Sequence, residues 1–83
     1  MRREEILAGI EGVAREHLNR QVRLRPEMDL VDDLELDSLL LLILAVEVEN
    51  NFHICLDQED EAAIRTVSDL VEAVHRKLEQ GPR

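Results

Sequence analysis

An unbroken apolar run, LLLLILAV, occupies residues 39–46 and follows directly on Asp37 and Ser38. A helix that spans a bilayer needs about 20 apolar residues, so this run is far too short to cross a membrane. Asp and Ser are both favoured N-cap residues, and we expect one of them to start a helix that continues to about Asn51. A helix that is apolar on every side raises the question of what covers its second face.

The helical period divides this segment into two faces. Spacings of three and four residues predict a core-facing stripe, which consists of Leu41, Leu44, Ala45, Val48 and Phe52. The other side carries Leu39, Leu40, Leu42, Ile43 and Val46. A small domain has little surface with which to cover both sides, and contiguous exposed apolar patches usually mark binding sites. We therefore predict a binding surface here; the alternative is a central helix that its neighbours cover on most sides.

Two other segments have the period of amphipathic helices. The first spans roughly residues 3–18, with apolar positions at Ile6, Leu7, Ile10, Val13, Ala14 and Leu18. The last follows a capping box, Thr66 to Asp69, and should end at Gly81-Pro82. Its apolar positions are Val67, Leu70, Val71, Val74 and Leu78. Between the second and last helices, the polar residues 58–63 leave room for one or two short helical turns.

Pro26 interrupts regular structure between the first two helices, and residues 23–37 are typical of a long structured loop. We expect its apolar residues to hold it against the core: Leu24, Met28, Leu30, Val31 and Leu34. No segment shows the alternation of a strand. The sequence therefore predicts one domain, residues 1–83, with an all-α fold: a small bundle of three longer helices plus one short helix, with a long structured loop between the first two.

The charge is unevenly distributed. The net charge is -9, yet residues 26–64 contain twelve acidic residues and no Lys or Arg, so all ten basic residues lie outside this segment. Nucleic-acid binding needs clustered cations, so we expect no nucleic-acid partner. An acidic middle suits partners with basic docking patches, although it is equally typical of a solvated face that keeps a protein soluble.

The single cysteine, Cys55, allows no internal disulfide, which fits a reducing compartment. The first residues do not resemble a signal peptide, and we expect a soluble, cytoplasmic protein. Because Cys55 stands between Ile54 and Leu56, we expect it to be a small buried hydrophobic residue rather than a reactive thiol.

Ser38 has no visible activating machinery. A nucleophilic serine needs a base within reach and a group that orients the base, but the histidines are scattered at positions 17, 53 and 75. No Gly-x-Ser-x-Gly turn occurs, and the carboxylates of DLVDDLELD lack the EF-hand pattern, so neither a hydrolase nor a metal site is predicted. Taken alone, Ser38 is a helix cap, and any chemistry on it must come from another protein.

The segment DLELDSLLLLILAVEVENNF resembles the central part of the acyl carrier proteins, whose signature is an Asp-Ser-Leu triplet that opens the second helix. The resemblance covers most of the chain. Besides LVDDLELDSL, the positions with family-like spacing are Glu47, Glu49, Phe52, Leu56, Ile64, Thr66 and Val67.

This resemblance implies that Ser38, between Asp37 and Leu39, accepts 4'-phosphopantetheine covalently from coenzyme A. A separate, Mg²⁺-dependent phosphopantetheinyl transferase would attach it. The thiol of the group would then carry acyl chains as thioesters between acyl-transferring or condensing enzymes of a fatty-acid, polyketide or specialised acyl pathway. The protein would be a carrier and not an enzyme, and we expect it to be a monomer. A helix N-terminus suits a phosphodiester, because it offers free N–H groups.

The sequence departs from the family pattern in two places. The family commonly has Gly two residues before the Asp, where this chain has Glu35, and it usually has acids where Leu40 and Ile43 stand. Docking should then depend more on apolar burial, worth about 25 cal/mol per Å², than on ion pairs worth about 0–1 kcal/mol each. The residues predicted to contact partners are Glu35, Leu39, Leu40, Leu42, Ile43, Val46 and Glu47.

Two alternatives remain open on the sequence. One is a peptidyl or aminoacyl carrier, although such domains more often resemble Gly-Gly-x-Ser where this chain has Asp37 before Ser38. The other is a non-covalent helical adaptor, in which the apolar second helix docks a partner and Ser38 only caps that helix.

Overall fold

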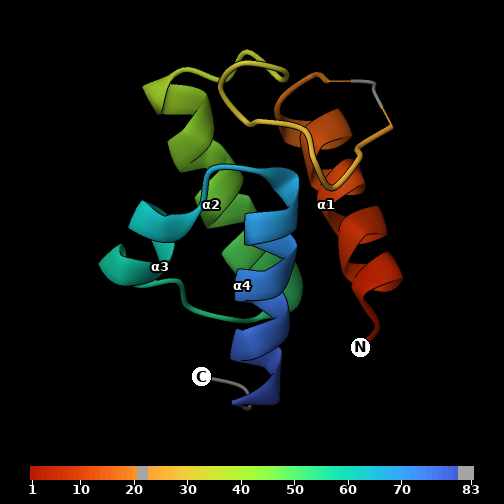
Figure 1. Ribbon diagram of the computed structural model, residues 1–83, viewed down its shortest axis with the longest axis vertical. Coiled ribbons are helices and arrows are strands. Elements are labelled where there is room, and N and C mark those ends of the chain that lie inside the picture. The colour runs from red at the N-terminus through yellow and green to blue at the C-terminus, as the bar shows by residue number, and fades with distance from the viewer. Residues whose placement is uncertain (21–22, 81–83) are drawn as a thin grey trace.

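The computed structural model describes residues 1–20 and 23–80. Within these ranges the chain forms α1 (Arg3–His17), α2 (Ser38–Phe52), α3 (Gln58–Ala63) and α4 (Val67–Glu79). The same residues contain no strand, only an isolated β-bridge between Asp29 and Thr66. Figure 1 shows the three longer helices gathered in a bundle, with α3 set to one side. The predicted all-α bundle of three longer helices and one short helix is confirmed.

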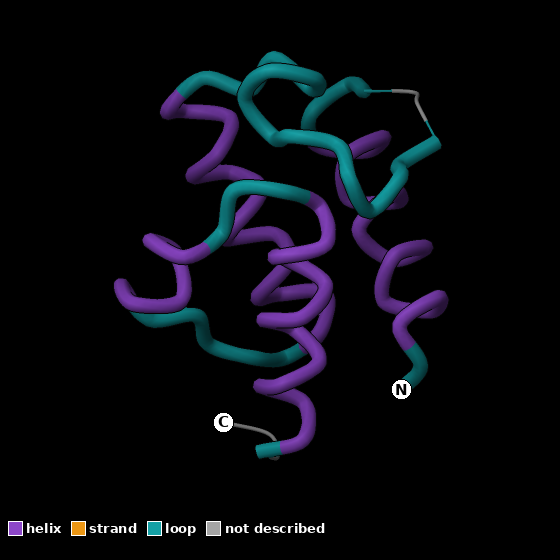
Figure 2. Tube along the Cα trace, in the orientation of Figure 1, coloured by secondary structure: helices purple, strands orange, loops and turns teal. Residues whose placement is uncertain are grey.

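The long loop between α1 and α2 covers one end of the bundle, whereas the first residues of the chain and the end of α4 lie at the other end (Figures 1 and 2). α1 packs against both α2 and α4. The core joins all these parts, and its fully buried side chains include Ile6, Ile10, Val48, Ile54, Val67, Leu70 and Val74. No helix among the described residues is long and apolar enough to cross a membrane.

Local capping signals explain where the helices begin. Asp37, rather than Ser38, is the N-cap of α2. At α4, the Asp69 N–H donates to Thr66 Oγ1 at 3.1 Å, and the Thr66 N–H donates to an Asp69 carboxylate oxygen at 3.0 Å, so the predicted capping box is confirmed. The short helix also falls at residues 58–63, as predicted. Gly81 and Pro82, which we expected to end α4, lie outside the described residues.

Four leucines hold the long loop on the bundle, and all are buried: Leu24, Leu30, Leu34 and Leu36. Met28 is partly buried against the core. Val31 is 52% exposed, so its predicted place in the core is wrong. The N–H groups of Val31 and Asp32 both donate to Asp29 Oδ1, which folds a tight turn. Val31 stands in that turn with its side chain in solvent.

Backbone hydrogen bonds fasten the same loop to the start of α4. The Leu30 N–H donates to the Arg65 carbonyl at 3.0 Å, and the Val67 N–H donates to the Met28 carbonyl at 2.9 Å. These bonds bring residues far apart in sequence side by side. They fix the position of the loop that leads into α2.

Cys55 is exposed, so the prediction of a buried cysteine is wrong. It lies in the connection from α2 to α3, between Ile54 and Leu56, which are both buried. Where side chains alternate along an extended segment, neighbours point to opposite sides. The two larger aliphatic residues take the inward positions, and Cys55 takes the outward one.

Candidate functional site

Ser38 is the first residue of α2, and its side chain is exposed. The preceding Asp37 has extended backbone angles, and its Oδ1 accepts a hydrogen bond from the Leu40 N–H at 2.9 Å. The Leu41 N–H donates to the Asp37 carbonyl at 2.9 Å. Asp37 therefore accepts the hydrogen bonds of two N–H groups in the first turn, and Ser38 lies exposed at the start of the helix.

The side chain of Arg20 holds the segment of chain that leads into Ser38. Its Nε donates to the Leu34 carbonyl at 3.0 Å, and its Nη1 donates to the Leu18 carbonyl at 3.3 Å. The side chain of Leu36 is buried just before the cap. One guanidinium thus joins the end of α1 to the segment that enters α2, which keeps the serine in a defined place.

The N–H groups of Ser38 and Leu39 donate no hydrogen bond to any residue that the structure describes. Unpaired N–H groups and the positive end of the helix dipole make a helix start suitable for a phosphate group. The exposed serine oxygen and these two N–H groups are the features that a serine-linked phosphodiester requires, so the residues present fit phosphopantetheine.

No side chain in the described part of the chain is hydrogen-bonded to Ser38 as an activating base would be. Nε2 of His17 lies 3.4 Å from Glu47 Oε1, and Nδ1 of His75 lies 3.4 Å from Glu79 Oε1. Among the described residues, none forms a side-chain hydrogen bond with the Ser38 hydroxyl. Ser38 thus has an exposed hydroxyl with no activating group beside it among the described residues.

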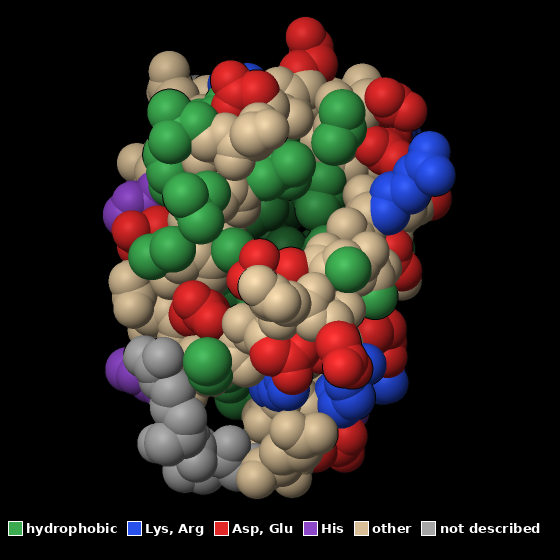
Figure 3. Space-filling model, turned by 90° about the vertical axis from the view of Figure 1, so that its left-hand side faces the viewer, with side chains coloured by type: hydrophobic (Ala, Val, Ile, Leu, Met, Phe, Trp, Pro, Cys, Tyr) green, Lys and Arg blue, Asp and Glu red, His purple; other side chains and the backbone are tan. Residues whose placement is uncertain are grey.

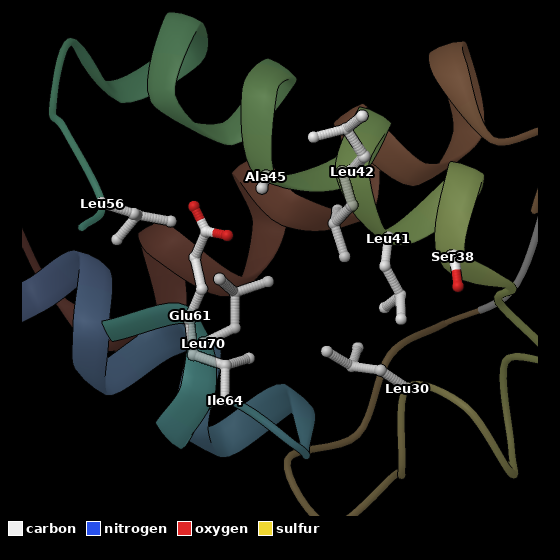
Figure 4. A pocket seen from close by; sticks show the side chains of 10 residues that line it. Leu30, Ser38, Leu41, Leu42, Ala45, Leu56, Glu61, Ile64 and Leu70 are labelled. Carbon is white, nitrogen blue, oxygen red and sulfur yellow. The ribbon is translucent and has the colours of Figure 1, made fainter. Parts of the chain in front are cut away.

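An apolar pocket of about 340 Å³ opens beside Ser38. It lies between α2, α3 and the core, and Figure 3 shows it as a hollow lined by hydrophobic side chains on this face. The residues that line it are Leu30, Ser38, Leu41, Leu42, Leu44, Ala45, Leu56, Glu61, Ile64 and Leu70. In Figure 4, Ser38 stands at one end of the pocket, and Leu56 and Glu61 stand at the other. A volume of this size is within the range of small-ligand sites.

The pocket changes the interpretation of the predicted core stripe of α2. Leu44, Val48 and Phe52 are buried, as predicted. Leu41 and Ala45 are only half buried and line the pocket. Helical spacing predicts which side a residue faces, but not whether that side meets a packed neighbour or a cavity.

The second face of α2 is graded rather than uniformly exposed. Leu39, Leu42 and Val46 are 63%, 58% and 42% exposed, and we refer to these three residues as the apolar edge. Leu40 and Ile43 are half buried and pack against the core, so they offer less surface to a partner than the sequence suggested. The apolar helix therefore has three parts: a buried stripe, half-buried flanks and the apolar edge.

The two predicted acidic contacts differ in their surroundings. Glu47 is half buried, and its carboxylate faces His17 of α1 rather than open solvent. Glu35 is exposed and has φ of 56°, in the left-handed region that favours glycine. The family glycine at this position thus has a conformational reason, and Glu35 adopts the same backbone region in spite of its side chain.

α3 forms one wall of the pocket, and its only buried residue is a carboxylate, Asp60. Asp60 Oδ2 lies 2.9 Å from Lys77 Nζ, and Oδ1 accepts a hydrogen bond from Arg76 Nη2 at 2.8 Å. Burial alone raises the pKa of Asp60, but the hydrogen bonds from Lys77, the Asp57 backbone and Arg76 outweigh it and hold that pKa well below its ordinary value. The wall is therefore fastened to α4 by an ionised side chain.

Residues 4–74 match the family described as "Phosphopantetheine attachment site". The chain is 36% identical over 80 residues to the meromycolate extension acyl carrier protein of Mycobacterium tuberculosis, which covers 95% of this chain and 70% of that protein. It is 30% identical over 73 residues to the acyl carrier protein of Myxococcus xanthus, which covers 87% of this chain and 92% of that protein.

The fold has a similar match. A solved structure from Mycobacterium tuberculosis, assigned as an acyl carrier protein, superposes with a TM-score of 0.73 at 34% identity, covering 89% of this chain and 95% of that one. Proteins of this family carry covalent 4'-phosphopantetheine, interact with a phosphopantetheinyl transferase and biosynthetic enzymes, and are carriers rather than catalysts. The exposed serine at the start of α2, the pocket beside it and the similarity along nearly the whole chain agree: this chain belongs to the acyl carrier protein family.

Proposed function

We propose that Ser38 is the residue to which 4'-phosphopantetheine is attached, and that the loaded protein shuttles acyl groups between enzymes. The support is the exposed Ser38 hydroxyl at the start of α2, with unpaired N–H groups at Ser38 and Leu39. When bound, the group supplies a thiol that holds acyl chains as thioesters. Ser38 would offer the accepting oxygen, Asp37 fixes the helix start, and the two N–H groups would be free to donate hydrogen bonds to the phosphate.

The proposal of an acyl cargo rests on the pocket beside Ser38. Eight of its ten lining residues are aliphatic and only Glu61 is charged, so most of the surface that a cargo meets suits an alkyl chain. A helical adaptor that docks only through its surface has no need of a cavity beside the serine. The pocket thus favours the acyl carrier over both alternatives left open by the sequence.

The relatives suggest a pathway. Several of them are named as meromycolate extension acyl carrier proteins. We propose that this protein serves a fatty-acid type of pathway, in which condensing and acyl-transferring enzymes act on the thioester. Because the identity is only 36% over 80 residues, the acyl group must be inferred from the residues that line this chain's own pocket.

The apolar edge is the proposed docking surface for these enzymes. Leu39, Leu42 and Val46 are the large exposed hydrophobic residues of α2, and the first turn of that helix contains no acidic residue. Acidic residues lie instead in the loop before it, including Glu35. A fitting partner would offer an apolar surface to the edge and basic residues to the loop.

We further propose that the carrier works as a monomer in the cytoplasm. The lone cysteine fits a reducing compartment, because the chain can form no internal disulfide. A monomer keeps the apolar edge available to successive enzymes. Sedimentation of the loaded protein would test this, since self-association through the edge would compete with docking.

Attachment at Ser38 can be tested by intact mass. Apo protein is incubated with coenzyme A, Mg²⁺ and a broad-specificity phosphopantetheinyl transferase. We expect a mass gain of one phosphopantetheine in the wild type and none in Ser38→Ala. Ser68→Ala, at the other serine of the chain, is the matched control and should be modified like the wild type. No gain with several transferases, or a gain that persists in Ser38→Ala, would overturn the proposal.

A further inference from the structure

Glu61 is the one charged residue among those that line the pocket. It projects from α3 toward α2, and Figure 4 shows its carboxylate beside Ala45 and Leu56, at the end of the pocket away from Ser38. Apart from Ser38 and Glu61, the lining is aliphatic. A carboxylate in such surroundings is a polar feature that a purely alkyl cargo does not need.

The carboxylate of Glu61 has no partner within the described part of the chain. No hydrogen bond or ion pair joins its side chain to another described residue. The neighbouring Asp60 turns the opposite way and holds the cations of α4, Lys77 and Arg76. Glu61 is exposed, so water satisfies its carboxylate while the pocket contains no cargo.

An alkyl chain in the pocket would remove part of that water. A carboxylate that loses water without gaining a donor is destabilised, and the penalty falls on whichever cargo causes it. A cargo that brings a hydrogen-bond donor replaces the lost water and avoids the penalty. Sites with an unpaired polar group reject analogues that lack the matching donor for this reason.

The position of Glu61 indicates which part of the cargo meets it. The prosthetic arm starts at Ser38, and Glu61 lies at the other end of the pocket. The part that reaches farthest from the serine is the acyl chain at the end of the arm, so the donor belongs to the acyl chain. A hydroxyl group is a neutral donor that an acyl chain can carry into an apolar pocket.

We propose that Glu61 makes this pocket selective for hydroxylated acyl chains, because its carboxylate accepts a hydrogen bond from the cargo hydroxyl. The inference rests on the proposed function, since it concerns an acyl chain attached through Ser38. It adds the class of cargo: the pocket holds a hydroxyacyl chain more tightly than a chain of equal length that has no hydroxyl group.

The test compares three cargoes on intact protein. Starting from the matching acyl-coenzyme A, the transferase attaches to Ser38 a phosphopantetheine whose thiol carries an octanoyl group, or the same chain with one hydroxyl at its third or its terminal carbon, and releases adenosine 3',5'-bisphosphate. Hydroxylamine then cleaves the thioester, and each rate is divided by that of the same free pantetheine thioester, which removes differences in intrinsic reactivity. A chain held in the pocket shields its thioester from hydroxylamine and is cleaved more slowly.

In the wild type, we expect at least one hydroxylated chain to be cleaved about tenfold more slowly than octanoyl, the effect of one hydrogen bond to a charged group. In Glu61→Leu, this advantage should disappear and octanoyl should become better protected. Glu59→Leu is the matched control, because Glu59 is exposed on the same helix and does not line the pocket. It should behave as the wild type.

Two results would overturn the inference: equal protection of all three chains in the wild type, or a hydroxyl advantage that survives in Glu61→Leu. An equal change for every cargo in Glu61→Leu would also count against it, since the carboxylate would then act on the arm. Failure to load Ser38 at all contradicts the proposed function instead, so the two failures are distinguishable. Thermal unfolding of the apo variants checks that each one folds.

Discussion

Asp60 of α3 and Lys77 of α4 form a partly buried ion pair, with 2.9 Å between Oδ2 and Nζ. Arg76 donates to the other oxygen of the same carboxylate. Asp60 is the only buried residue of α3. This ion pair therefore anchors the short helix to the bundle, as buried hydrophobic side chains anchor the longer helices. The wall of the pocket is thus held by charge on one side and by Leu56 and Ile64, which flank the helix, on the other.

Removing this carboxylate should loosen the wall. We expect Asp60→Ala to lower the free energy of unfolding by about 3 kcal/mol, the low end for a broken buried pair, because Arg76 is half exposed. Urea unfolding measures the change. Glu59→Ala, at an exposed position of the same helix, should alter stability by less than about 0.5 kcal/mol. Equal, small effects of both substitutions would show that Asp60 does not anchor α3.

The same ion pair predicts how stability depends on pH. The folded-state pKa of Asp60 lies below its ordinary value of 3.8, so its contribution is fully present above that value and is lost as the pH falls toward the folded pKa. Asp60→Asn removes this titration. We expect unfolding midpoints measured below about pH 5 to fall less steeply in the variant than in the wild type.

Part of the acid slope should persist in Asp60→Asn. Hydrogen bonds also lower the pKa values of other carboxyl groups. The Asp32 backbone lowers that of Asp29, and the Thr66 backbone lowers that of Asp69. The Arg3 side chain lowers that of Glu72. The comparison therefore concerns the difference between two slopes. Parallel curves for the two proteins would contradict the assignment of this titration to Asp60.

Two glycines of α1 offer a matched pair of substitutions. A Cβ on Gly9 would lie 2.6 Å from Phe52 Cζ, whereas one on Gly12 would meet only Arg15 Nη2 at 3.9 Å. We expect Gly12→Ala to stabilise the protein by up to about 1 kcal/mol through helix propensity. Gly9→Ala should destabilise it by about 1–3 kcal/mol, because the buried Phe52 must shift. Thermal unfolding checks the signs, and a gain in both variants would show that α1 and α2 can separate at no cost.

The elements that could be predicted from the sequence are those with local causes. The Thr66–Asp69 capping box lies within four residues, and so does the reciprocal pair of Asp57 and Asp60 that starts α3. Periodicity likewise places Ile6, Ile10 and Val13 in the core. The Asp-Ser-Leu resemblance identifies Ser38 as the candidate site, and the structure places this residue, exposed, at the start of α2.

The pocket could not be predicted, because it depends on where α3 lies relative to α2. That placement rests on the contact of Asp60 with Lys77, which are far apart in the sequence, and on two flanking aliphatic residues. Leu41 and Ala45 therefore looked like core residues, and Glu61 looked like one more acid of a charged segment. The lone charge beside an apolar stripe becomes informative only when the two helices are seen together.

Glu35 provides a test of backbone strain. Its φ of 56° is costly for a residue with a Cβ, by about 1–2 kcal/mol, and glycine avoids that cost. We expect Glu35→Gly to raise the free energy of unfolding by about 1 kcal/mol, reduced from the full strain by the greater entropy of the unfolded chain. Urea unfolding measures it.

Two controls separate conformation from charge. Glu35→Gln removes the charge but keeps the Cβ, so it should not reproduce the gain. Asp32→Gly places glycine at an exposed loop residue outside the positive-φ set, and it should be neutral or destabilising. A gain in Glu35→Gln as large as in Glu35→Gly would mean that charge repulsion, and not the backbone, penalises this residue.

The last prediction concerns the apolar edge and its half-buried flank. Val46→Glu changes an exposed side chain, so we expect unfolding free energy within about 0.5 kcal/mol of the wild type. Because the apolar contact with the partner is lost, modification of Ser38 by the transferase should slow by about tenfold in kcat/KM. Leu40→Glu places a charge against the core, so it should lower the free energy of unfolding by about 2 kcal/mol. Ala8→Glu adds the same charge to an exposed position of α1 and should change neither property. If Val46→Glu reacts as fast as Ala8→Glu, the edge is not a docking surface for this enzyme; if it unfolds the protein, Val46 belongs to the core.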